Sequence, residues 1–117
     1  CDEAPRYVSW SRQNRSQLVR IPQVKGTNCR MELRSPDPAC NPSLAVCLVL
    51  AAGLDGIDHR MVRQAPIYKN LLDPAEAAGL GLERLPSTLE EAVQAAQESE
   101  FLHRVLPEEL SHLYYEE

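Results

Sequence analysis

The segment that most constrains the fold is the apolar run in "PDPACNPSLAVCLVLAAG", residues 36–53. Asn41 is a favourable helix N-cap, and Pro42 suits the first helical position, so we expect a helix from about Pro42 to Gly53. This helix has almost no polar face, and such helices are normally buried on most sides. We therefore predict that it forms the centre of the core, with strands on one side and later helices on the other.

The remaining segments indicate an α+β fold. Residues 7–11, 16–21 and 29–35 are typical of short strands, and the last two are expected to form a hairpin around Lys25 and Gly26. The segment after Gly53 is expected to be mostly connection, up to one capped helical turn after Asp73. A capping box of Ser87 and Glu90 predicts an amphipathic helix, and another helix starts near residue 107. We expect short antiparallel strands, about 7–35, packed on a buried helix with two or three further helices, the helical part covering about 41–117.

Charge and cysteine content narrow the functional classes. The net charge is -5, but the first 34 residues carry +4 and the remainder -9. A basic segment on an acidic chain favours a local anion site, and with 5% aromatic residues it argues against nucleic-acid binding. No apolar run approaches the roughly 20 residues of a membrane span. No two of the four cysteines have CxxC spacing, so we expect reduced thiols and a cytoplasmic protein.

The strongest chemical pattern lies in the third predicted strand. Arg30, Glu32 and Arg34 are two residues apart, so they share one face, while Met31 and Leu33 are expected to face the core. The hairpin would bring the Arg20 region alongside. This arrangement is either an ion pair on a solvated sheet face, or a metal-binding glutamate between arginines that hold phosphate or carboxylate. The residues alone leave both interpretations open.

A series of motifs extends this pattern along the chain. "SWSRQNRSQLVRIP" is followed by "RMELRSPDPACNPSLAVCLVLAAGLDGI", which contains NRS, RIP, E-x-R-x-x-D-P, NP-x-L and AGLDGI in that order. This pattern closely resembles the C-terminal catalytic domain of type I glutamine synthetases, over essentially the whole chain. The resemblance implies that residues 1–117 are the C-terminal portion of that domain, with the upstream half and the N-terminal domain absent.

The resemblance also implies an activity and roles for individual residues. The family joins ammonia to glutamate in an ATP-dependent reaction through a γ-glutamyl phosphate, assisted by Mg²⁺ or Mn²⁺. By position, Glu32 resembles a metal ligand, and Arg34 a catalytic residue that contacts glutamate and the transferring phosphoryl group. Arg15 resembles a second catalytic residue at the γ-phosphate and glutamate, while Arg20 and Lys25 resemble contacts to ATP.

The same resemblance implies a state of assembly, and alternatives to the ligase function remain open. The family forms homo-oligomeric rings, dodecameric in the type I enzymes, and we expect no nucleic acid or membrane partner. The chain by itself is predicted to be inactive. A glutamate–amine ligase of the same superfamily is an alternative, because Ser43 stands where many synthetases have tyrosine; a non-catalytic binding or assembly module is another. Leu72 stands where some bacterial relatives carry an adenylylated tyrosine, so we expect that switch to be absent.

Overall fold

The computed structural model describes residues 3–115, which divide into two compact units. One unit combines the chain up to Cys40 with Val62–Leu85, and the other combines Asn41–Met61 with the chain from Pro86 onward. Both units are therefore built from segments that are separated in the sequence. Within residues 3–115, no helix is long and apolar enough to cross a membrane.

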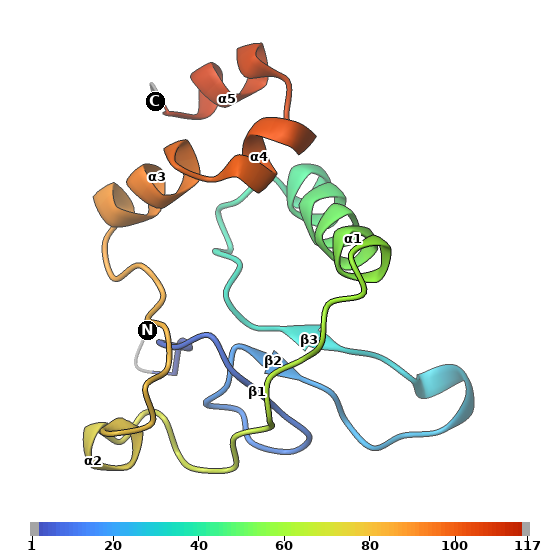
Figure 1. Cartoon of the computed structure of the whole chain (residues 1–117), viewed down its shortest axis with the longest axis vertical. Coiled ribbons are helices and arrows are strands. Elements are labelled where there is room, and N and C mark those ends of the chain that lie inside the picture. Colours follow the sequence, from blue (N-terminus) through green and yellow to red (C-terminus); the bar gives the residue numbers. More distant parts are fainter. Residues whose placement is uncertain (1–2, 116–117) are drawn as a thin grey trace. The chain divides into compact units, whose positions relative to one another are not determined.

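The first unit is organised by a small three-stranded sheet in the order β1-β2-β3 (Figure 1). The strands are β1 (Trp10–Ser11), β2 (Val19–Arg20) and β3 (Glu32–Leu33), each inside a predicted range. β2 and β3 pair antiparallel, as predicted, but β1 and β2 pair parallel, so the all-antiparallel prediction is wrong for that pair. The reason lies in the loop 12–18, which carries the chain back to the start of β1 before β2 begins.

The connections around the sheet agree with the turn signals. The β2–β3 hairpin contains a short 3-10 turn, η1 (Gly26–Asn28), where Gly26 adopts a φ of +69°. α2 (Pro74–Ala77) is capped by Asp73, whose side chain accepts a hydrogen bond from the Ala75 amide. The predicted hairpin centre and the predicted capped turn are both confirmed.

The core of the first unit lies around one aromatic side chain. Trp10 is 9% exposed, and its indole nitrogen donates a 2.7 Å hydrogen bond to the Gln64 carbonyl. The Arg63 guanidinium lies 4.5 Å from the centre of the Trp10 ring, within cation–π range. Leu71 and Ala77 are also buried. These contacts join β1 to the segment 62–85.

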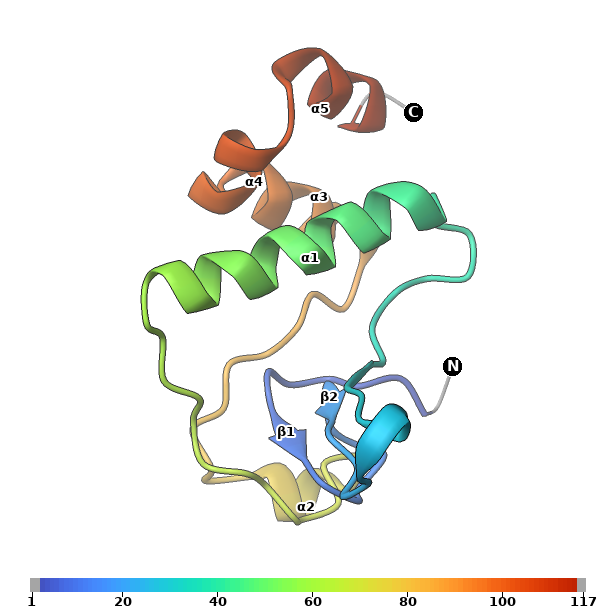
Figure 2. The same cartoon turned by 90° about the vertical axis from the view of Figure 1, so that its right-hand side faces the viewer.

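The second unit is dominated by α1 (Pro42–Asp58) (Figure 2). Asn41 is its N-cap, as predicted, and accepts a 3.2 Å hydrogen bond from the Leu44 amide. The helix continues beyond Gly53 to Asp58, so the predicted end was too early. A glycine inside a helix costs only about 1 kcal/mol relative to alanine, which is too little to end the helix at Gly53.

The predicted burial of α1 is wrong. The described structure buries none of its residues, and Leu50 and Ile57 are 63% and 73% exposed. An apolar sequence indicates that a helix is suited to burial. The helix is buried only if another surface is present to cover it. The same unit supplies a partner for one face only.

Three shorter helices complete the second unit: α3 (Leu89–Gln97), α4 (Glu100–Val105) and α5 (Glu108–Tyr115). The predicted capping box is displaced by one residue, because Thr88 is the N-cap and accepts from the Glu91 amide. The Glu91 carboxylate instead binds the Ser87 amide and hydroxyl at 2.7 and 2.8 Å. Ser99 caps α4 and so separates it from α3.

Candidate functional site

The candidate site is centred on an ion pair between β2 and β3. Arg20 and Glu32 are directly opposite in the antiparallel register. The Arg20 Nε and Nη2 atoms donate to Glu32 Oε2 and Oε1 at 2.7 and 2.6 Å, which is a bidentate geometry. Arg30 adds a third hydrogen bond, from its Nε to Oε1 at 3.0 Å. The predicted proximity of Arg20 and Glu32 is therefore confirmed.

This geometry keeps the Glu32 carboxylate ionised. The hydrogen bonds from Arg20 hold the pKa of Glu32 below its ordinary value of 4.5; partial burial opposes this effect, and Arg30 adds to it. Two guanidinium groups around one carboxylate leave the group of three side chains with a net positive charge. The chemistry of this group is therefore suited to an anion.

The metal-ligand prediction for Glu32 fits less well with the residues that surround it. Both of its oxygens already accept hydrogen bonds from arginine. Across the described residues, no group of three or more His, Cys, Asp or Glu side chains could hold a metal ion. Mg²⁺ and Mn²⁺ need several oxygen ligands, so the residues described do not form a metal site by themselves.

Arg34 follows β3 and is held by its backbone. Its amide donates a 2.9 Å hydrogen bond to the Leu18 carbonyl. Its Nη2 atom reaches the Glu3 carbonyl at 3.5 Å, while Nη1 is buried without a hydrogen-bond partner. An unpaired buried donor costs free energy, and this nitrogen has no acceptor among the described residues.

Met31 departs from the predicted strand alternation. It is 55% exposed instead of facing the core. β3 begins only at Glu32, so the pleat that would turn Met31 inward is not formed at that residue. Met31 instead lines a shallow apolar hollow of about 420 Å³ together with Trp10 and Val19.

Arg15 lies in the loop between β1 and β2, and its side chain is exposed. Lys25 is likewise exposed, at the start of the η1 turn. Within residues 3–115, neither side chain forms a hydrogen bond or ion pair with Glu32. The structure thus brings Arg20, Arg30 and Glu32 together, and it leaves Arg15 and Lys25 as separate cationic groups.

The residues beside Arg15 form a polar network that the sequence reasoning missed. Asn14 Nδ2 donates to the Lys69 carbonyl at 2.8 Å, and its Oδ1 accepts from the Ser16 amide and hydroxyl, both at 2.8 Å. The Ser16 hydroxyl accepts a 3.0 Å hydrogen bond from the Leu71 amide. Gln17, which is 0% exposed, donates from Nε2 to the same Lys69 carbonyl at 3.0 Å.

This network fixes the backbone on both sides of Arg15 while its side chain points to solvent. The signal in the sequence was the set of polar residues around Arg15, namely Asn14, Ser16 and Gln17, whose side chains suit hydrogen bonding to nearby backbone. The neighbours of Arg15 hold the loop in place by hydrogen bonds, and Arg15 is the residue that this loop exposes to solvent.

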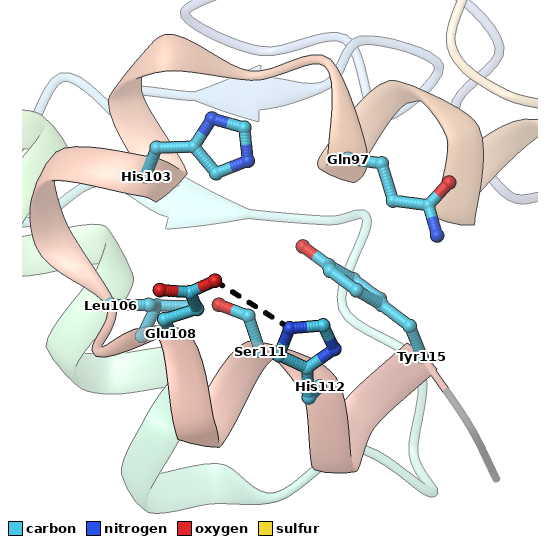
Figure 3. A pocket seen from close by; sticks show the side chains of 7 residues that line it. All are labelled: Gln97, His103, Leu106, Glu108, Ser111, His112 and Tyr115. Carbon is cyan, nitrogen blue, oxygen red and sulfur yellow. Dashed lines mark ion pairs between the residues drawn. The ribbon is translucent and has the colours of Figure 1, made fainter.

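A second hollow, not predicted from the sequence, lies within the other unit between α3, α4 and α5 (Figure 3). It measures about 570 Å³, and the His103 and His112 imidazoles and the Tyr115 ring border it (Figure 3). His112 Nε2 lies 3.7 Å from Glu108 Oε1, but the Glu108 side chain is 88% exposed. Such an exposed ion pair contributes little to stability.

Comparison with known proteins identifies relatives of the whole chain. The family model "Glutamine synthetase, catalytic domain" matches residues 2–117. A glutamine synthetase of Methanosarcina mazei is 46% identical over 108 residues, covering 91% of this chain and 24% of that protein. A glutamine synthetase of Staphylococcus aureus strain MW2 is 40% identical over 114 residues, covering 96% of this chain and 25% of that protein.

A solved structure described as "GmaS/ADP complex-Conformation 1" has a similar fold. It superposes with a TM-score of 0.76 at 29% sequence identity, and the alignment covers 98% of this chain and 27% of that one. This chain therefore spans about a quarter of the length of the relatives that it matches.

Proposed function

Because the chain belongs to the glutamine synthetase family, by a match to its catalytic domain, we propose that it supplies one wall of a ligase active site. The proposed reaction joins ammonia to the side-chain carboxylate of glutamate and consumes ATP. In it, the glutamate carboxylate attacks the γ-phosphorus of ATP, the bond to ADP breaks, and ammonia then displaces phosphate from the γ-glutamyl phosphate.

The observation that carries this proposal is the bidentate pair of Arg20 and Glu32, flanked by Arg30. Both reacting substrates are anions, and phosphoryl transfer depends mainly on positioning and on neutralising charge. A guanidinium held in a fixed orientation suits that task, because its donors match phosphate and carboxylate oxygens. Glu32 orients Arg20 and Arg30 before a substrate arrives, which avoids the free-energy cost of ordering them during binding.

Arg15 and Arg34 are proposed to contact the substrates directly. The hydrogen bonds of Asn14 and Ser16 hold the loop on either side of Arg15. The backbone from which the exposed Arg15 guanidinium extends is therefore fixed. Arg34 has a buried Nη1 atom without a partner, which favours a role in binding a carboxylate or phosphoryl oxygen. Lys25 is proposed as a peripheral contact to the nucleotide.

The divalent cation that the family resemblance implies would neutralise charge on the ATP phosphates when bound. Glu32 is the one predicted ligand in this chain, and the residues described do not complete a site around it. We therefore propose that further ligands come from elsewhere in the protein, and no step of the mechanism is assigned to the cation. Assembly into a homo-oligomeric ring is proposed on the same family basis.

The test is a chimera in which this chain replaces the 108 matched residues of the Methanosarcina mazei glutamine synthetase. The chimera is expected to form glutamine from glutamate, ammonia and ATP. Arg34→Ala should lower kcat by about 100-fold or more, as for loss of a donor that stabilises transition-state charge. The matched control, Arg12→Ala, changes an exposed arginine and should leave kcat within about twofold. Equal rates in the two variants would refute the role of Arg34.

A further inference from the structure

Lys69 lies beside the loop that carries Arg15. The Lys69 carbonyl accepts hydrogen bonds from Asn14 Nδ2 at 2.8 Å and Gln17 Nε2 at 3.0 Å, and the Ser16 Oγ atom lies 3.5 Å from it. Ser16 and Gln17 are buried, at 4% and 0% exposed. Residues on both sides of Arg15 therefore hold one main-chain atom of Lys69, and this contact fixes how far apart the two backbones lie.

The charged ends of Arg15 and Lys69 are within reach of one extended anion. Neighbouring Cα atoms are about 3.8 Å apart, so the contact between Ser16 and Lys69 places the Cα atoms of Arg15 and Lys69 within roughly 12 Å of each other. Both side chains are exposed, and each is long and flexible enough to extend over about half of that distance. A single polyphosphate can therefore contact both cations.

Neither cation is neutralised within the described structure. In residues 3–115, the basic side chains that form ion pairs are Arg20, Arg30, Arg104, His59 and His112. Glu76 is an acid close to Lys69 in sequence, but its carboxylate accepts a hydrogen bond from the Asn70 amide instead. Two like charges at this separation repel each other weakly, and an anion that binds between them attracts both. The arrangement of Arg15 and Lys69 therefore favours an anionic ligand.

The same loop also leads to the ion-pair group at the centre of the candidate site. The loop 12–18 leaves β1 after Ser11, and the register partner of Ser11 on β2 is Arg20. Arg20 belongs to the positively charged group described above. Lys69 is thus connected through this loop to the end of the sheet where the anionic substrates are proposed to bind.

We propose that Lys69 is a further binding residue for the phosphate groups of ATP, acting beside Arg15. A triphosphate spreads several negative charges over a length that one guanidinium does not cover, whereas a single carboxylate is matched by one bidentate arginine. The Lys69 ammonium suits a polyphosphate because it is a compact point charge on a flexible stem. The inference rests on the proposed ligase function, since it takes Arg15 to face the nucleotide.

Steady-state kinetics of the chimera described above test this role. Lys69→Ala should raise the KM for ATP by about tenfold and change kcat by less than about threefold, because the lost contact is present in both the ground state and the transition state. Lys69→Arg keeps the positive charge, so its KM for ATP should stay within about threefold of that of the unsubstituted chimera. A merely structural role for Lys69 would instead lower kcat or the Tm.

The matched control is Arg60→Ala, which removes another exposed cation, just after the end of α1. This variant should leave the KM for ATP within about twofold. If Lys69→Ala leaves the KM for ATP unchanged in a chimera that forms glutamine, the role of Lys69 is refuted and the ligase function stands. A rise in the KM for glutamate alone would likewise refute the assignment to ATP.

Protection of the lysine from acetylation gives a readout that needs no turnover. The chimera is treated with the N-hydroxysuccinimide ester of acetic acid in magnesium buffer, either alone, with ATP or with AMP, and acetylation of Lys69 is followed by peptide mass mapping. ATP should slow this acetylation by at least about fivefold, whereas AMP, which lacks the β- and γ-phosphates, should not.

The outcomes of this experiment separate the inference from the proposed function. Equal acetylation of Lys69 with and without ATP would overturn the inference, whether or not the chimera forms glutamine. Equal protection by AMP and ATP would also overturn it, because the contact would then be to the adenosine monophosphate part. Protection by ATP alone, in a chimera that forms no glutamine, would support the inference and contradict the proposed ligase function.

Discussion

Arg20 and Glu32 lie opposite each other in the antiparallel register of β2 and β3, and two hydrogen bonds of 2.7 and 2.6 Å join them. Their side chains are 17% and 31% exposed, so the pair is shielded from solvent on one side. Hydrogen bonding across two strands also ties the hairpin together next to its loop, because Arg20 and Glu32 are the paired residues nearest to the loop 21–31. The pair therefore has a structural effect that is measurable without any substrate.

The pH dependence of this pair follows from the direction of the pKa shift. Because Arg20 lowers the pKa of Glu32 below 4.5, the pair stabilises the fold above that pH, and the contribution is lost as pH falls through the lowered pKa. NMR titration of the Glu32 side-chain carbon should give a pKa below 4.5. Arg20→Gln should raise that pKa towards the ordinary value, whereas Arg12→Gln should not change it. An unchanged pKa in Arg20→Gln would contradict the assigned cause.

Ser16→Ala is expected to destabilise the first unit. Ser16 is 4% exposed, and its hydroxyl accepts a hydrogen bond from the Leu71 amide. Removing the hydroxyl leaves a buried amide without an acceptor, which costs about 1–3 kcal/mol of unfolding free energy. Urea unfolding followed by the fluorescence of Trp10, the single tryptophan, measures the loss.

The control for this prediction is Ser35→Ala. Ser35 is exposed, so its substitution should change the unfolding free energy by less than about 0.5 kcal/mol. If the Ser16 and Ser35 variants unfold at the same urea concentration, the network does not stabilise the Arg15 loop.

The displaced cap of α3 predicts different effects for two neighbouring residues. Thr88→Ala removes the acceptor of the Glu91 amide and should cost about 1 kcal/mol of helix stability. Ser87→Ala removes an exposed side-chain hydrogen bond but keeps the cap, so its effect should be smaller. Amide hydrogen exchange in Leu89–Gln97 measures both. A larger effect from Ser87→Ala would support the capping box expected from the sequence.

The 117-residue chain by itself is expected to form no glutamine from glutamate, ammonia and ATP. Glu32 is its one predicted metal ligand, and its described residues do not build a cation site. A coupled assay for ADP release, run beside the chimera as a positive control, measures this. A rate above the enzyme-free background would contradict the proposal that further active-site residues lie elsewhere in the protein.

The sequence predicted the site best where local periodicity determines geometry. Strand alternation and the hairpin together placed Arg20 beside Glu32, because register in an antiparallel pair follows from both. The same reasoning could not predict the parallel pairing of β1 and β2, because that depends on how the loop 12–18 crosses back. Local pattern carries no information on that crossing.

The errors on α1 and α3 have two different physical origins. Ser87 and Thr88 are adjacent and both residue types are good N-caps, so residue type alone does not choose between them. The burial of α1 depends on surfaces distant in sequence, which composition cannot place. Asn14, Ser16 and Gln17 were missed for a similar reason, since their partners lie more than 50 residues away.

The polar network around Arg15 uses main-chain oxygen as its anchor. Asn14 and Gln17 both donate to the carbonyl of Lys69, an atom that every amino acid carries. Substituting Lys69 therefore changes the side chain without removing the anchor, whereas deleting one residue between Gln64 and Lys69 would shift the anchor relative to Trp10. The orientation of Arg15 should therefore tolerate substitution of Lys69. It should depend on the length of the segment 64–69, which is far from Arg15 in the sequence.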